Sequence, residues 1–228
     1  DQGSAVVSGI AVGTGGNVNI TSTGLSTSVT SLRIRATNSI TGCTRLLDAA
    51  DVVVVNGIPS APTITPVGST TVCESSPGVV LNSSAGSGNQ WYLNGVMLPG
   101  ETGASITIAT LPANSGNYTV TQTLSGCTSA PSAALSVTVN ALPIDRTVTP
   151  VLPTTVCSGQ TISLTIANSQ SGINYEIVDQ GNAVVSGIVV GTGGNVSITT
   201  NALNTSVTSL RVRATNSITT CSFILSTT

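Results

Sequence analysis

The sequence contains no histidine and no lysine, and these absences exclude several kinds of chemistry. Histidine is the most common general base and metal ligand in proteins. Lysine is required for P-loop nucleotide binding and for Schiff-base catalysis. The sequence also has no Cys-x-x-Cys pair that would indicate a zinc site. We therefore expect no catalytic residue, no cofactor and no metal site in this chain.

Charge and long apolar runs are also scarce. Six arginines stand against eight acidic residues, so the net charge is −2 and we expect no nucleic-acid partner. The longest apolar run, residues 52–55, is far shorter than the ~20 residues that span a bilayer, so we expect no membrane insertion in this segment. The opening residues, DQGSAVVSG, lack the basic end and apolar core of a signal peptide.

The residues that are abundant favour β-strands. Hydrophobic residues make up 39% of the chain and charged residues only 6%, a balance that argues against disorder. Most of the hydrophobic residues are valine, isoleucine, leucine and alanine, interleaved with serine and threonine, as in half-buried strands. The composition therefore predicts an all-β, extracellular structural protein.

The chain repeats itself with two spacings. Residues 1–50 match residues 179–228 without gaps at 35 of 50 positions, an offset of 179 − 1 = 178. A shorter match, TITPVGSTTVC at 63–73 against TVTPVLPTTVC at 147–157, has an offset of 147 − 63 = 84. We therefore predict two related domain types, A and B, arranged end to end in a tandem array. The predicted parts are the C-terminal part of a B-type repeat at 1–56, an A-type repeat at 57–140, and a B-type repeat with a truncated last strand at 141–228.

The A-type repeat is predicted to be an immunoglobulin-like (Greek-key) β-sandwich. Short alternating segments such as NQWYLNG and NYTVTQTL are separated by Gly, Pro, Asn and Ser clusters, and Trp91 follows Leu81 at the spacing expected of strands B and C. The segment LPANSGNY at 111–118 resembles the corner that begins strand F in this fold. The usual inter-sheet cysteines would fall near Ser83 and Val120, so the core has no central disulfide. The expected core residues of this repeat are Trp91, Leu81, Ile106, Tyr118 and Val120.

The B-type repeat is predicted to follow the same plan. Tyr175 lies 84 residues after Trp91, which makes it the expected core aromatic residue of strand C. Glu176 points to the opposite face from Tyr175, so we expect it to pair with Arg211 or Arg213 on the neighbouring strand F, as a cross-strand charge ladder. The expected core residues on strand F are Leu210 and Val212, which alternate with the two arginines.

The five cysteines are expected to form structural disulfides, which indicates an oxidising, extracellular compartment. In an immunoglobulin-like sandwich, Cys73 and Cys127 fall at corners that a strand of roughly 27 Å keeps apart. A disulfide needs Cα atoms within about 7 Å. We therefore predict an interdomain Cys73–Cys221 disulfide, with Cys127, Cys157 and Cys43 bonded to partners outside this segment. The alternative is pairing within repeats, Cys73 with Cys127 and Cys157 with Cys221.

Carboxylate or serine catalysis is not expected. Glu176 and Asp179 should lie on opposite faces of one strand, and the acidic residues of the A-type repeat, Glu74 and Glu101, fall in loops. No base stands beside any of the many serines. We therefore predict that the protein is not an enzyme.

The segments TTVCSGQTISLTIANSQSGINYEI, QWYLNG and SGNYTVTQTLSGC resemble repeat domains of very large bacterial surface adhesins. These are the immunoglobulin-like tandem repeats of the gliding-motility and type IX-secreted adhesins of the Bacteroidota, and the resemblance covers the whole chain. It implies export, a location on the bacterial cell surface, and neighbouring repeats of the same chain as partners.

Two functions fit this resemblance. The first is a structural segment, a stalk or filament, of a secreted or surface-anchored adhesin. Near-identical repeats and a short linker, VNALPIDRTV, favour it. The alternative is a series of adhesive modules that bind surface glycans or proteins, with avidity from copy number. The alternative requires exposed aromatic residues at loop tips, and Tyr92 is the one candidate.

Overall fold

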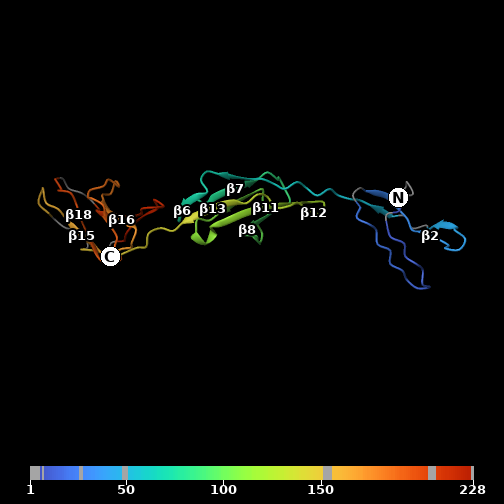
Figure 1. Cartoon of the computed structure of the whole chain (residues 1–228). Coiled ribbons are helices and arrows are strands. Elements are labelled where there is room, and N and C mark those ends of the chain that lie inside the picture. Colours follow the sequence, from blue (N-terminus) through green and yellow to red (C-terminus); the bar gives the residue numbers. More distant parts are fainter. Residues whose placement is uncertain are drawn as a thin grey trace.

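The computed structural model describes residues 6, 8–25, 28–47, 51–150, 156–204 and 209–226. These residues form β-strands and one short 3-10 helix, η1 (Pro112–Asn114), with no α-helix among them, and this confirms the predicted all-β class. Figure 1 shows three groups of strands that follow one another in chain order. No helix within the described ranges is long and apolar enough to cross a membrane.

The middle group consists of two sheets. In the first sheet, β7 pairs antiparallel with a strand on each side. Its strands, in spatial order, are β10 (Ser105–Ile108), β7 (Val79–Ser83) and β5 (Ile64–Val67). The second sheet contains one parallel pair, β6 with β13, and its other pairs are antiparallel. Its strands are β6 (Thr71–Cys73), β13 (Leu135–Asn140), β11 (Gly116–Leu124), β8 (Asn89–Leu93) and β9 (Val96–Met97), with β12 (Cys127–Thr128) also on β11.

The core of the middle group lies between these two sheets. Trp91, Leu81 and Val120 have no exposed surface and come from β8, β7 and β11. The indole N–H of Trp91 donates a hydrogen bond to the carbonyl of Gly103 (3.0 Å), so burial leaves this donor satisfied. The two sheets are therefore held together by packing, with Ser83 and Val120 near the positions where the predicted fold commonly has inter-sheet cysteines.

The segment before β11 forms a tyrosine corner. The hydroxyl of Tyr118 donates to the carbonyl of Asn114 (2.8 Å), four residues upstream and at the end of η1. The side chain is 2% exposed, and burial raises the pKa of Tyr118 because the ionised form would lose its hydration. The corner that the sequence LPANSGNY predicted is thus present.

The third group repeats the arrangement of two sheets. One sheet contains β14 (Val148–Thr149), β15 (Ser163–Ile166) and β18 (Val196–Thr199). The other contains β17 (Val189–Val190), β16 (Ile173–Val178), β19 (Arg211–Asn216) and β20 (Ser222–Ile224). Tyr175 and Val212 are fully buried between the sheets, and Leu210 is nearly so.

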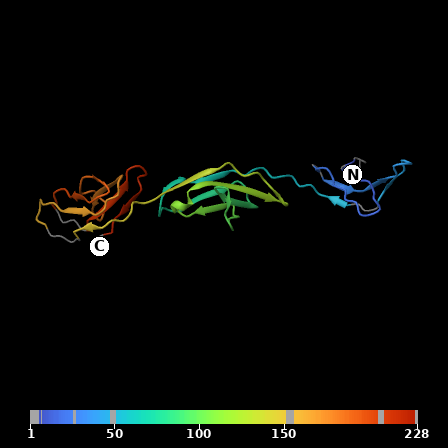
Figure 2. The ribbon, with the colours of Figure 1, turned by 60° about the horizontal axis from the view of Figure 1, so that its bottom comes forward.

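The first group has only small sheets and no enclosed core in its described part. One sheet pairs β1 (Val29–Leu32) with β4 (Asp51–Val53), and the other pairs β2 (Arg35–Thr37) with β3 (Thr44–Leu46). Apolar side chains that would normally be buried are exposed here, among them Val18, Ile20, Ile34 and Leu47. In Figure 2 a stretch of chain without strands connects this group to the middle group, and another connects the middle group to the third.

Candidate functional site: the disulfide-bonded junction

Cys73 lies at the end of the middle group from which the chain, after Asn140, continues to the third group. It is the last residue of β6, and the parallel register places it beside Asn140, the last residue of β13. The amide of the next residue, Glu74, donates to the carbonyl of Asn140 (2.8 Å). The sheet edge therefore holds Cys73 next to the first residues of the linker that leads to the third group.

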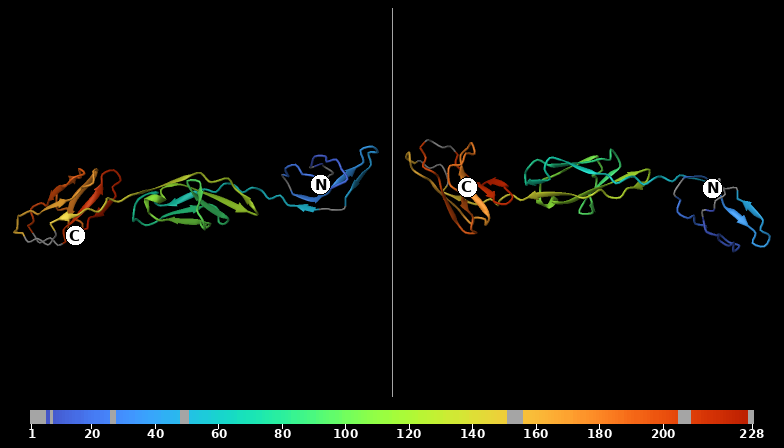
Figure 3. Two further views of the ribbon diagram at one scale, coloured as in Figure 1. Left: turned by 90° about the horizontal axis from the view of Figure 1, so that it is seen from below. Right: turned by 45° about the horizontal axis from the view of Figure 1, so that its top comes forward.

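Cys221 lies on the tight turn between β19 and β20. The side-chain oxygen of Asn216 accepts hydrogen bonds from the amides of Ile218 (2.9 Å) and Thr219 (3.0 Å), and the amide of Asn216 donates to the carbonyl of Cys221 (2.9 Å). These bonds close the turn and fix its shape. Figure 3 shows this hairpin, in red, projecting toward the middle group.

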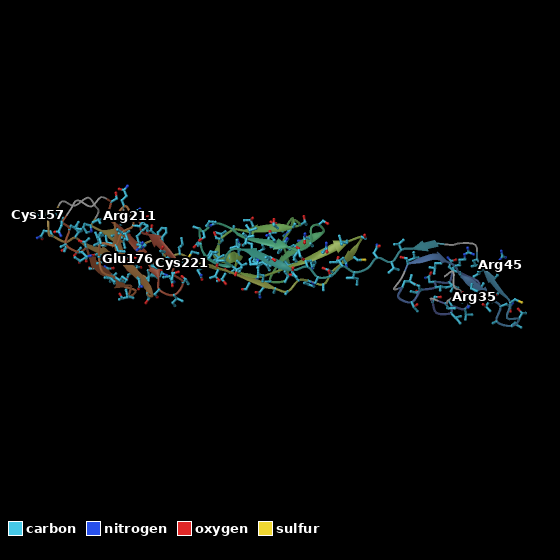
Figure 4. All side chains as sticks on the ribbon, turned by 90° about the horizontal axis from the view of Figure 1, so that it is seen from above. Arg35, Arg45, Cys157, Glu176, Arg211 and Cys221 are labelled. Atoms are coloured by element: carbon cyan, nitrogen blue, oxygen red, sulfur yellow. A yellow bond between two sulfur atoms is a disulfide. The ribbon has the colours of Figure 1, made fainter. Side chains whose placement is uncertain are left out.

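The structure joins Cys73 and Cys221 in a disulfide with 5.5 Å between their Cα atoms. This is the predicted interdomain pairing, and it excludes the two alternative pairs within repeats. Cys43, Cys127 and Cys157 are free thiols, of which the first and last are exposed. Figure 4 shows Cys221 at the end of the third group that faces the middle group, and Cys157 at its opposite end.

The linker itself is held from both sides. From the middle group, the carboxylate of Glu74 accepts a hydrogen bond from the amide of Leu142 (3.3 Å). From the third group, the side chain of Gln170 accepts one from the amide of Ile144 (3.0 Å). The linker thus has fixed contacts with both of the groups that it connects.

A third contact ties the linker to the C-terminal end of the described chain. The amide of Ser226 donates to the carboxylate of Asp145 (2.9 Å). Hydrogen bonds from the side chain and the backbone of Ser226 lower the pKa of Asp145, because they stabilise the ionised carboxylate. None of the linker contacts was predicted, because each pairs a side chain with a backbone amide and leaves no sequence pattern.

The charge ladder forms with one of its two arginines. Arg213 binds Glu176 with 2.6 Å between Nη2 and Oε1, and these residues lie opposite each other on β19 and β16. Arg211 instead donates to the backbone carbonyls of Asp179 (3.2 Å) and Gln180 (3.1 Å). Arg211 therefore holds the turn after β16, and only the Glu176–Arg213 part of the expected ladder is a salt bridge.

The carboxylates considered for catalysis take part in structural contacts. Glu176 is paired with Arg213, Asp179 accepts a hydrogen bond from the amide of Ala183 (2.9 Å), and Glu74 binds the linker. No group of three or more His, Cys, Asp or Glu side chains among the described residues could hold a metal ion. The arrangement of the junction serves to join two sandwiches covalently and to hold the chain between them.

Comparison with family models finds a match over the middle group. The family model described as Ig-like domain CHU_C associated matches residues 59–141. Comparison with curated proteins gives no match.

Comparison with solved structures finds several similar chains. The chain is similar to the human OSCAR ligand-binding domain, with 14% identity over 75% of this chain and 96% of that chain (TM-score 0.31). It is also similar to a chimeric titin tandem, with 18% identity over 72% of this chain and 95% of that chain (TM-score 0.28). It is also similar to one chain of the complex between a mouse coronavirus receptor-binding domain and its murine receptor, with 15% identity over 74% of this chain and 100% of that chain (TM-score 0.37). With the strand order of its sheets, the family match shows that the protein has an immunoglobulin-like fold.

Alkylation of the native, unreduced protein is expected to label three cysteines and to spare two. Cys43 and Cys157 are exposed and should react fastest, and Cys127 more slowly, because it is half-buried and its Sγ lies 3.5 Å from the carbonyl of Asn56. Peptide mapping without reduction should recover Cys73 linked to Cys221. A linked Cys73–Cys127 peptide would contradict the pairing, and reduction before alkylation, with all five cysteines labelled, is the control.

Proposed function

We propose that this chain is a structural segment of the stalk of a large, secreted or surface-anchored bacterial adhesin. The observation that carries the proposal is the Cys73–Cys221 disulfide, which joins one sandwich covalently to the next. Both sandwiches also bind the linker between them, through Glu74 and Gln170. A junction with a second covalent connection and a tethered linker resists bending, and resistance to bending is what a stalk requires.

The same features support the location and the family of adhesin. Disulfides persist in oxidising compartments, so the bond fits an extracellular protein on the bacterial cell surface. The family match at 59–141 fits the resemblance to adhesin repeats of the Bacteroidota, including those of the gliding-motility and type IX-secreted kind. In this proposal residues 57–140 and 141–228 are successive repeats, and residues 1–56 are the C-terminal part of another.

The alternative, an array of adhesive modules, finds less support. It needs exposed aromatic side chains, and Tyr92 is half-buried on β8, where it lies opposite Met97 of β9. The strand surfaces carry hydroxyl pairs such as Ser163 with Thr199 (2.7 Å), which satisfy each other. Saturable binding of the chain to a glycan or protein array would favour the adhesive function over the spacer.

Small-angle X-ray scattering is expected to give an elongated particle. A compact chain of 228 residues has a radius of gyration of about 17 Å, whereas three domains in a row should give about 30 Å or more. The double variant Cys73→Ser, Cys221→Ser should keep the sandwiches but broaden the distance distribution, because the junction loses its covalent bond. A radius of gyration near that of a compact chain would contradict the stalk.

A further inference from the structure

The middle group carries a cysteine at the same place on its hairpin as the third group. Cys127 begins β12 and pairs with Leu124, the last residue of β11. Cys221 directly precedes β20, and its carbonyl accepts a hydrogen bond from the amide of Asn216, the last residue of β19. Figure 1 shows β12 at the end of the middle group that faces the first group. Each hairpin therefore brings a cysteine toward the group that precedes it in the chain.

Cys73 and Cys157 occupy matching turns, one in each sandwich. They are separated by the repeat offset of 84 (157 − 73 = 84). The carbonyl of Cys73 accepts a hydrogen bond from the amide of Ser76 (3.2 Å), and the carbonyl of Cys157 accepts one from the amide of Gln160 (3.1 Å). The second residue after each cysteine has a positive φ (63° and 85°). Cys157 therefore lies in the same local backbone structure as Cys73, which is disulfide-bonded.

The hairpin of the middle group contacts the preceding linker at a position that matches the disulfide-bonded junction. Asn56 and Asn140 match at the offset of 84 (140 − 56 = 84), and the register of β6 and β13 places Asn140 beside Cys73. The thiol of Cys127 donates to the carbonyl of Asn56 (3.5 Å), and the side chain of Asn56 donates to the carbonyl of Ser125 (2.9 Å). Cys127 is thus held at the linker residue beside which the counterpart of Cys73 belongs in a B-type repeat.

We propose that Cys157 of a B-type repeat forms a disulfide with Cys127 of the A-type repeat that follows it. Paired strands lie about 4.8 Å apart, so the counterpart of Cys157 beside Asn56 would lie next to the Cys127 thiol. Junctions from A to B and from B to A would then alternate along the array, each closed by one disulfide. The inference rests on the repeat arrangement in the proposed function and names the partner of each remaining hairpin cysteine.

Formation of this bond requires an oxidant that is itself a disulfide. The thiolate of one cysteine attacks the oxidant and forms a mixed disulfide, and the second cysteine then displaces the remaining thiol. The two cysteines lose two protons and two electrons in total, and the oxidant takes up both and becomes two thiols. Cys157 is exposed and Cys127 is half-buried, so we expect Cys157 to react with the oxidant first and Cys127 to displace it.

The first test adds an A-type repeat after the third group. Because Thr228 corresponds to Ala50 (228 − 178 = 50), residues 51–140 can follow Thr228 in the register of the repeat. Serine replaces the native Cys127 and the appended copy of Cys73, so that every remaining cysteine peptide is unique. After oxidation with oxidised glutathione, peptide mapping without reduction should recover Cys157 linked to the appended copy of Cys127. Maleimide labelling of Cys157 should be lost, since the thiolate is the reactive species.

The Cys73–Cys221 bond is the internal control for folding and oxidation of the extended chain. When that bond is present, a free Cys157, or Cys157 linked to any other cysteine, would overturn the proposal. Serine at the appended copy of Cys127 should restore the labelling of Cys157. Cys43→Ser is the matched control, because it removes another exposed thiol and should leave the new bond intact.

A second chain tests the same bond from the other side. Because Asp1 corresponds to Asp179, residues 141–178 can be placed before Asp1 to give a B-type repeat in front of the middle group, with the native Cys157 changed to serine. We expect the added copy of Cys157 to link to Cys127 and to protect it from alkylation. A reactive Cys127 beside an intact Cys73–Cys221 bond would reject the pairing even if the first chain did not fold.

The outcomes for this bond and for the stalk can be told apart. An elongated particle in solution scattering with an unlinked Cys157 in the extended chain would reject the second kind of disulfide and leave the stalk function standing. A compact particle that nevertheless contains the Cys157–Cys127 bond would reject the stalk and retain the bond.

Discussion

Reduction of the Cys73–Cys221 disulfide is expected to lengthen the fully unfolded chain by about 500 Å when it is pulled from its two ends. The bond spans 148 positions of sequence, and an extended residue covers ~3.3–3.6 Å. While the disulfide is intact, tension passes from Cys73 directly to Cys221 and bypasses the chain between them. Single-molecule force spectroscopy, with handles at residues 1 and 228, measures this difference as released contour length.

The bypassed region includes most of both sandwiches. In the oxidised protein, tension can reach β5 and β6 of the middle group but not the buried strands β8 and β11. The double variant Cys73→Ser, Cys221→Ser should release the full length without reductant, and Cys43→Ser, at an exposed free thiol, should behave like the parent. Equal contour lengths before and after reduction would mean that the chain is not closed between these residues.

The second large effect is expected at Trp91. Replacement by alanine should reduce the free energy of unfolding of the middle sandwich by about 3–5 kcal/mol, since the indole is fully buried and its removal leaves a cavity. The hydrogen bond to Gly103 would also be lost. With no central disulfide to hold the sheets together, this loss is comparable to the whole stability of a small domain. Hydrogen exchange of β7, β8 and β11 measures the effect within this sandwich.

Two neighbouring substitutions calibrate the result. Tyr92→Ala alters the adjacent residue of the same strand, and we expect a loss of about 1 kcal/mol or less because Tyr92 is only half-buried. Trp91→Phe keeps a ring in the core and should fall between the two. If Trp91→Ala changed stability by no more than Tyr92→Ala, the core described here would be wrong.

The parts of the structure that follow from side-chain pattern could be predicted from sequence. Trp91 follows Leu81 at the spacing expected of two facing strands, and Tyr175 takes the place of Trp91 in the next repeat. The Cys73–Cys221 bond was predictable because the geometry of the fold separates the corners within one domain and brings them together across a junction. In each case the residue type and its spacing both carry the information.

The pairing of backbone strands and the side-chain contacts to backbone amides could not be predicted in the same way. The short strand β6 pairs in parallel with β13, and such pairing has no local sequence signature. Glu74 and Gln170 bind backbone amides of the linker, and every residue except proline has such an amide.

The disulfide also changes what a single proteolytic cut does to the protein. It closes the chain between Cys73 and Cys221 into a covalent ring that contains nearly all the loops of two sandwiches. A protease that cleaves one peptide bond inside this ring opens a loop, but the segments before Cys73 and after Cys221 stay attached to each other. An extracellular fibre made of such rings would remain unbroken after nicks that would sever a simple string of domains.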